Sequence, residues 1–179
     1  MYPSVTTIVS ISDRPADAQG DEPAMSADIA FERAFEEHWT GVFRFALAWT
    51  NDWTAAEDLS QEAFLRLWNG RDRLDWSRPA LPWLLVTTRR LATDRFRALR
   101  RHLAGSLRED DAGAGDPALR ARWLDVSAGL AVLSPLERSA LVMTAIEGMS
   151  YDDAAAVLDT TAGALRAAVS RARAKLENA

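Results

Sequence analysis

Three polar side chains near the end of the chain recur at helical spacing and are of types that contact nucleic acid. Arg166, Ser170 and Arg173 are four and three residues apart, so a helix places them on one face. Guanidinium groups bind both phosphates and the edges of bases. The apolar residues of the same stretch recur on another face and can pack against a core: Leu165, Val169, Ala172 and Leu176. The pattern predicts a DNA-reading helix flanked by Arg171 and Lys175, with a surface helix whose cations are merely solvated as the alternative.

A second cationic stretch lies earlier in the chain. Residues 71–108 contain ten arginines and three aspartates, although the whole chain has a net charge of −5. Trp76 and Trp83 bracket a loop that contains Arg78, and aromatic rings beside cations suit unstacked bases as well as phosphates. Tryptophans near the start of a helix are as often part of a core, so both interpretations stay open for each ring. Two basic stretches in an acidic protein indicate two separate contacts with a polyanion.

A third polar surface is acidic. In the stretch from Ala55 to Trp68 the apolar residues recur on one side of a helix. Four polar residues occupy mostly the other side: Glu57, Asp58, Gln61 and Glu62. Such a surface is either solvated or binds a basic partner.

The composition excludes several kinds of chemistry. The 179 residues include no cysteine, which excludes disulfides, thiolate catalysis and zinc bound by thiolates. His38 and His102 are far apart and lie beside no acidic cluster, so we expect no metal site and no cofactor. We find no nucleophile–base pair and no phosphate-binding loop, which makes an enzyme the least favoured class. No apolar run approaches the roughly 18 residues that span a bilayer, and the first residues lack the pattern of a signal peptide. We therefore expect a cytoplasmic protein without membrane insertion.

Helices must position the three polar surfaces. We expect a first helix over residues 28–50, which Asn51-Asp52 ends. The acidic helix should begin at an N-cap Thr54, with Glu57 completing a capping box, and end at Gly70. Pro82 suits the first position of the arginine-bearing helix.

Further helix starts follow in the second part of the chain. Pro117 suits a first turn, and Ser134 with Glu137 forms a second capping box for a helix that reaches about residue 147. Ser150 begins the next helix, and Asp159-Thr160 turns the chain into the final basic one. The prediction is an all-α fold of two small helical bundles joined by a flexible linker. Its parts are a mobile tail (1–27), a first bundle (28–102), the linker (103–116) and a second bundle with a helix-turn-helix (117–179).

Four motifs in order resemble one known family. AEDLSQEAFLRLW (Ala56–Trp68) and WLLVTTRRLATDRFRALRR (Trp83–Arg101) are similar to region 2 of bacterial RNA polymerase sigma factors of the extracytoplasmic-function group. LSPLERSALVMTAIEGMSYDDAAAVL (Leu133–Leu158) and GALRAAVSRARAKL (Gly163–Leu176) are similar to region 4. The resemblance covers about Ala30 to Leu176, which is all but the tail.

The resemblance implies an alternative sigma factor that directs promoter-specific transcription initiation. Its partners would be core RNA polymerase, through the clamp helices and the flap, promoter DNA, and an anti-sigma factor. Region 2 would bind the clamp helices through Glu57, Asp58, Gln61 and Glu62. It would melt and read the −10 element through Trp76, Arg78, Trp83, Arg89, Arg90, Arg95 and Arg97, with the loop Trp76–Leu81 capturing a base. Region 4 would read the −35 duplex through Thr161, Arg166, Ser170, Arg171 and Arg173.

The chain departs from the family pattern at four positions. The family usually has Asn at Arg90, Thr at Ala164, a basic residue at Ala168 and Gly at Asp159, where the backbone needs a left-handed cap. We expect Ala164 and Ala168 to weaken phosphate contacts at the −35 element. Two other classes remain as alternatives. One is a sigma-like mimic that sequesters an anti-sigma factor without touching DNA, and the other is a helix-turn-helix repressor, which would leave the first half of the chain idle.

Overall fold

The computed structural model describes residues 26–102 and 129–178 of the chain, and no strand occurs among them. The N-terminal half (26–102) contains α1 (Ala27–Thr50), α2 (Trp53–Gly70), the short turn η2 (Arg71–Arg73) and α3 (Ala80–His102). The C-terminal half (129–178) contains α5 (Pro135–Leu141), the short π-helix η3 (Val142–Ile146), α6 (Tyr151–Leu158) and α7 (Ala162–Glu177). The all-α prediction is confirmed for these residues. The predicted linker, the tail up to residue 25 and the start expected at Pro117 lie outside the described residues.

Local side-chain chemistry determines where the first two helices begin and end. Ser26 precedes α1 and accepts a hydrogen bond from the Ile29 amide at 3.3 Å, and Asn51 ends the helix in a left-handed conformation with φ 57°. Helix α2 begins at Trp53, because the Asp52 carboxylate accepts from the Ala55 amide at 2.9 Å. The prediction of Thr54 as N-cap is therefore wrong. Aspartate caps a helix at least as well as threonine, so the helix starts two residues earlier.

The arginine-bearing helix also starts earlier than expected. α3 begins at Ala80, which places Pro82 at the third helical position rather than the first. The first four amides of a helix have no intrahelical partner, so a proline is tolerated anywhere in this turn. The predicted end of α2 at Gly70 is confirmed.

Side-chain caps define the helices of the C-terminal half as predicted. The Ser134 hydroxyl accepts from the Glu137 amide at 3.3 Å, and the Glu137 carboxylate accepts from the Ser134 amide at 2.8 Å, so the capping box is complete. Ser150 caps α6 by accepting from the Asp153 amide at 3.1 Å. Asp159 then takes a left-handed conformation with φ 56° in the turn to α7. This turn places α6 and α7 as a helix-turn-helix.

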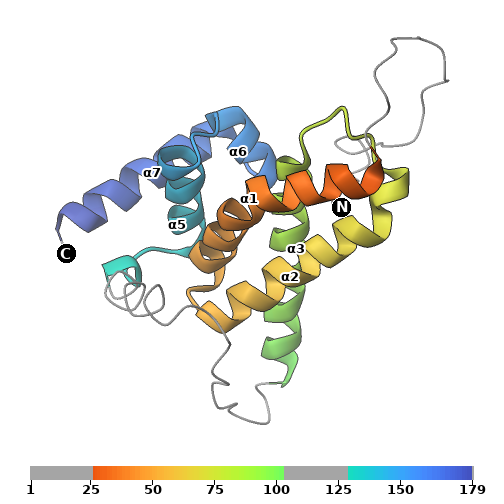
Figure 1. The fold of residues 1–179 in the computed structure, drawn as a ribbon. Helices are drawn as coiled ribbons and strands as arrows, with labels where there is room; N and C mark the ends of the chain where they lie inside the picture. The colour runs from red at the N-terminus through yellow and green to blue at the C-terminus, as the bar shows by residue number, and fades with distance from the viewer. Residues whose placement is uncertain (1–25, 103–128, 179) are drawn as a thin grey trace, which may run out of the picture.

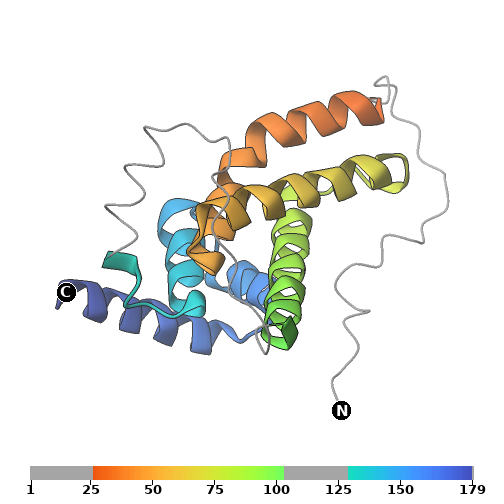
Figure 2. The same cartoon turned by 90° about the horizontal axis from the view of Figure 1, so that it is seen from below.

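The two halves share one apolar core. Helix α1 packs against α2 and α3 of its own half and against α5 and η3 of the C-terminal half (Figure 1). Seen from below, α6 lies beside α3, and α5 lies beside the end of α1 (Figure 2). Val42 and Phe45 of α1 are fully buried in the same cluster as Met143 and Leu165. Burial of this apolar surface holds the halves together, which the predicted two-bundle architecture did not anticipate.

A buried arginine adds a polar connection between the halves. Arg138 of α5 is only 6% exposed, and its Nε donates to the carbonyl of Ala48 at 2.7 Å. Its Nη1 donates to the carbonyl of Leu133 at 2.6 Å. The Ala48 carbonyl belongs to the last turn of α1, where helical carbonyls lack intrahelical donors. The last turn of α1 has no basic residue of its own, so α5 supplies the cation that complements the helix dipole.

Candidate nucleic-acid interface

The basic helix α7 presents the polar face that its spacing predicted. Leu165, Val169 and Ala172 are at most 2% exposed, which confirms that this side packs on the core. The side chains of the other face are exposed: Arg166, Ser170 and Arg173. Thr161 is the N-cap of the helix, and its hydroxyl accepts from the Ala164 amide at 3.1 Å. The cap fixes the first turn of α7 and thereby the direction in which Arg166 projects.

An aromatic ring supports the start of this basic face. The guanidinium of Arg166 lies 5.2 Å from the ring centroid of Tyr151, which begins α6. A cation stacked on a ring loses less entropy when it binds a phosphate or a base, because its conformations are already restricted. Tyr151, Arg166, Ser170 and Arg173 line one shallow hollow between α6 and α7. Sequence spacing could not have found Tyr151, since it lies on a different helix.

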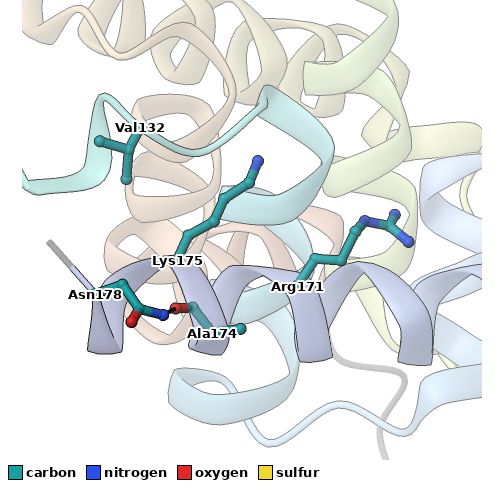
Figure 3. Close-up of a pocket in the computed structure, with 5 residues that line it drawn as sticks. All are labelled: Val132, Arg171, Ala174, Lys175 and Asn178. Atoms are coloured by element: carbon teal, nitrogen blue, oxygen red, sulfur yellow. Dashed lines mark hydrogen bonds between the residues drawn. The ribbon is translucent and has the colours of Figure 1, made fainter.

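The cations that flank the polar face are held by a buried carboxylate. The Glu137 side chain is 5% exposed and accepts from Lys175 Nζ at 2.8 Å and from Arg171 Nε at 3.4 Å. The hydrogen bond from Lys175, together with that from the Ser134 amide, lowers the pKa of Glu137 from 4.5 to about 2. Figure 3 shows Arg171 and Lys175 projecting from the side of α7 that faces α5, in a groove that Val132 also lines. Part of the cationic charge of α7 therefore stabilises the fold.

One expectation about α7 is wrong. Ala168 has no exposed surface and packs inside the core, so a cation at this position would point away from the polar face. Its difference from the family pattern removes no phosphate contact from that face. Ala164 is exposed in the first turn, and its position leaves the corresponding expectation open.

Helix α3 holds four of the predicted cations in different states. Arg90 is exposed, and Arg97 is exposed and lies 3.5 Å from Asp94 one turn earlier. Arg95 donates from Nη1 to Asp58 of α2 at 2.9 Å, and both side chains are about half exposed at 52% and 54%. Arg89 is only 18% exposed and lies 3.7 Å from Asp159 of the C-terminal half. Phe96, which apolar spacing did not single out, is 59% exposed among these cations.

The loop before α3 is anchored by one of its tryptophans. Trp76 Nε1 donates to the carbonyl of Arg71 at 2.9 Å, and its ring packs partly against the core. Trp83 also packs partly against the core. Arg78 is exposed at the loop surface and lies 3.4 Å from Asp75. The Ser77 hydroxyl and amide both donate to the Asp75 carboxylate, and these hydrogen bonds restrict the turn. They also lower the pKa of Asp75.

The acidic face of α2 is accessible along its length. Asp58 and Gln61 are exposed, and Glu57 and Glu62 are partly exposed. Glu62 accepts from Arg66 Nε at 2.9 Å on the same helix. Leu65 lies on this side as well and is 55% exposed. The Asp58–Arg95 pair joins this face to α3, so the acidic and cationic surfaces of the N-terminal half are neighbours.

None of the helices in the described residues is both long and apolar enough to cross a membrane.

The family model of Sigma-70 region 2 matches residues 34–102, and that of Sigma-70 region 4 matches residues 124–176. These matches cover the acidic face, the arginine-bearing helix and the helix-turn-helix. Each of the three surfaces thus lies inside a matched region.

Curated relatives agree with the family models. The chain is 32% identical over 157 residues to the RNA polymerase sigma factor CarQ of Myxococcus xanthus, which covers 84% of this chain and 88% of that protein. It is 36% identical over 137 residues to the ECF RNA polymerase sigma factor SigC of Mycobacterium tuberculosis, which covers 74% of this chain and 73% of that protein.

Two solved structures share the fold across both halves. One is the sigma factor RpoE in complex with the anti-sigma factor NepR from Bartonella quintana, with a TM-score of 0.66, 25% identity, and coverage of 83% of this chain and 94% of that one. The other is CnrH in complex with the cytosolic domain of CnrY, with a TM-score of 0.62, 28% identity, and coverage of 85% and 92%. With both sigma regions matched and relatives aligned across most of their length, the chain belongs to the RNA polymerase sigma factors of the extracytoplasmic-function group.

Proposed function

We propose that this alternative sigma factor divides its work among the three surfaces. The acidic face of α2 binds the clamp helices of core polymerase, α3 with its preceding loop opens and holds the −10 element, and α7 reads the −35 duplex. The observation that carries the proposal is the exposed row of Arg166, Ser170 and Arg173 on a capped, core-packed helix of a helix-turn-helix. Such a helix fits the major groove, where arginine binds guanine through two hydrogen bonds.

The charges of the N-terminal half support the other two roles. An acidic surface favours association with a basic partner and guides its encounter. Arg90 and Arg97 are exposed on α3, and a row of cations binds a single strand mainly through its phosphates. Arg78 projects from the loop, which suits it to a flipped base or its phosphate, whereas the Trp76 ring shapes the loop from below. Arg89 would join this set when Asp159 releases it.

The protein would act without catalysis of its own, in the cytoplasm, where polymerase and promoters are. An anti-sigma factor is the expected inhibitor, because the RpoE structure that shares the fold is a complex with the anti-sigma factor NepR. The flap of core polymerase would contact the C-terminal half. The proposed region 2 spans residues 28–102 and the proposed region 4 spans residues 117–179, with a helix that would begin at Pro117. The linker (103–116) would join them.

The test separates promoter reading from polymerase binding. Replacing Arg166 and Arg173 with alanine removes two base or phosphate contacts, each worth about 1–3 kcal/mol at a specific site. We expect the variant to bind core polymerase normally while the reconstituted holoenzyme loses its −35-dependent promoter binding. Arg33→Ala removes an exposed arginine from α1 and serves as the control for charge. Unchanged promoter binding by the double variant would refute the assignment of α7, and would favour a mimic that binds only proteins.

A further inference from the structure

The short turn η2 joins α2 to the loop before α3 (residues 74–79), and apolar burial does not hold this turn in place. None of its three residues is buried, and Gly70, which precedes the turn, provides no side-chain cap. Asp72 and Arg73 are exposed, whereas the Arg71 side chain is only 24% exposed. The conformation of η2 therefore depends mainly on the contacts of Arg71.

The guanidinium of Arg71 connects the end of α2 to the first turn of α1. Its Nε donates to Asp28 of α1 at 2.6 Å, and its Nη1 donates to the carbonyl of Trp68 at 3.0 Å. Its central carbon lies 3.7 Å from the centroid of the Trp68 ring, which packs edge-on against Phe31 of α1. Figure 1 shows the start of α1 beside the end of α2. A charge-assisted hydrogen bond, a second hydrogen bond and a ring contact thus restrict one side chain.

The backbone of Arg71 extends this restraint to the loop before α3. Its carbonyl accepts from the indole Nε1 of Trp76 at 2.9 Å and from the Leu74 amide at 3.4 Å. Leu74 and Trp76 pack partly against the core, whereas residues 77–79 are exposed. The exposed part of the loop therefore begins directly after the residue that Arg71 anchors. A shift of the Arg71 carbonyl would move the whole exposed part of the loop, and a binding site tolerates little displacement of its supporting residues.

We propose that Arg71 is a positioning residue for −10 recognition, because its contacts with α1 and α2 hold the loop before α3 in the shape that accepts a flipped base. This inference rests on the proposed capture of a base by that loop. Arg71 acts through the loop, since its own Nε and Nη1 already donate to protein acceptors. A pocket that is held in shape loses less conformational entropy when the base enters. The phosphate contacts proposed for α3 do not pass through η2, so base capture and backbone binding should respond differently to changes at Arg71.

Three substitutions separate the contacts of this residue. Arg71→Met removes both donated hydrogen bonds and keeps an unbranched side chain that can still cover Trp68. Arg71→Lys keeps the charge but loses the planar fork, so it should retain part of the wild-type behaviour. Asp28→Asn removes the charge of the partner on α1, at a side chain that is 61% exposed and far from the loop in sequence. Arg33→Met removes an exposed arginine from the next turn of α1 and serves as the matched control.

The assay measures capture of one base by the assembled holoenzyme. The probe is the fluorescent non-template strand of a promoter mapped by run-off transcription, in which abasic sites replace the bases of the −10 element one at a time. For the wild type we expect one position where removal of the base weakens binding about tenfold or more. With Arg71→Met this loss should fall to about threefold or less, because the intact base gains less from a loop that is no longer held in shape. The losses at the other positions and the affinity for core polymerase should stay unchanged.

The outcomes distinguish this inference from the proposed function. A wild-type profile without a position-specific loss would refute base capture by the loop, and the positioning role with it. The same abasic profile for the wild type and Arg71→Met would overturn the positioning role alone, and so would an equal effect of Arg33→Met. A loss that is uniform over all positions would indicate a merely structural role for Arg71 and would also overturn the inference. If Arg71→Met does not fold, Asp28→Asn decides by the same comparison, with a smaller change expected in the same direction.

Discussion

Replacing Arg138 with methionine should destabilise the whole protein, because this side chain donates hydrogen bonds to a carbonyl in the last turn of α1 and to a carbonyl just before α5. Methionine fills a similar volume, so the change removes hydrogen bonds and creates little cavity. The carbonyls of Ala48 and Leu133, which the guanidinium approaches at 2.7 and 2.6 Å, would be left buried without a donor. Each such carbonyl costs about 1–3 kcal/mol. Allowing for some entry of water, we expect a loss of about 2–4 kcal/mol in the free energy of unfolding.

The loss corresponds to a fall of about 4–16 °C in Tm, at about 2–4 °C per kcal/mol for a chain of this size. Thermal unfolding of the full chain followed by circular dichroism at the helical band measures it, and urea unfolding gives the free energy directly. Arg66→Met is the matched control, because Arg66 is exposed on α2 and its pair with Glu62 contributes about 0.3–0.5 kcal/mol. Arg138→Lys keeps the charge but not the planar fork, and should fall between the two. If Arg138→Met and the control unfold within 1 °C or so of each other, the buried guanidinium does not hold the halves together, and the reasoning is refuted.

Three further substitutions test other parts of the structure. Glu137→Gln should lower the free energy of unfolding by about 1–3 kcal/mol at neutral pH. Because the pKa of Glu137 is about 2 in the folded protein against 4.5 in the unfolded chain, the difference in stability from the wild type should persist above pH 4.5 and disappear as the pH falls toward 2. Urea titrations at several pH values measure this difference. Glu57→Lys should weaken binding to core polymerase most strongly at low salt, whereas Glu36→Lys, an equal charge reversal on α1, should not; fluorescence anisotropy against core enzyme measures both. Trp76→Phe replaces the indole with a smaller ring that cannot donate to the Arg71 carbonyl, and the lost hydrogen bond alone should cost about 0.5–1.5 kcal/mol of stability in urea unfolding. An unchanged midpoint would argue against the anchored loop.

The features that follow from local periodicity and capping were predictable from the sequence. The apolar spacing of Leu165, Val169 and Ala172 correctly identified the buried side of α7, because one helical face is determined by its own residues. The capping box of Ser134 and Glu137 was also correct, since both bonds form within one turn. The left-handed turn at Asp159 was expected and is confirmed.

The errors at the start of α2 and at Ala168 have different causes. Asp52 and Thr54 are both good N-cap residues, and the sequence alone does not decide which of the two side chains caps α2. Ala168 was assigned from a family pattern rather than from its own helical position. Its spacing of three from Leu165 already places it near the buried side of α7.

The contacts between distant segments could not be predicted. The Arg138–Ala48 bond joins residues 90 positions apart, and the Arg44–Glu147 contact joins residues 103 apart. Hydrophobic patterns specify that each half has a core, and they do not specify that the two cores merge. The same limit applies to Arg89, which had the spacing of an exposed cation but lies under the C-terminal half.

The role of this chain as a promoter-specificity subunit is tested most directly by run-off transcription. Core RNA polymerase is incubated with genomic promoter fragments with and without the protein, and the transcripts are mapped to their start sites. We predict discrete start sites that appear only when the protein is present, and that disappear with the Arg166→Ala, Arg173→Ala variant. A protein that neither binds core polymerase nor supports any start site in this assay would contradict the account.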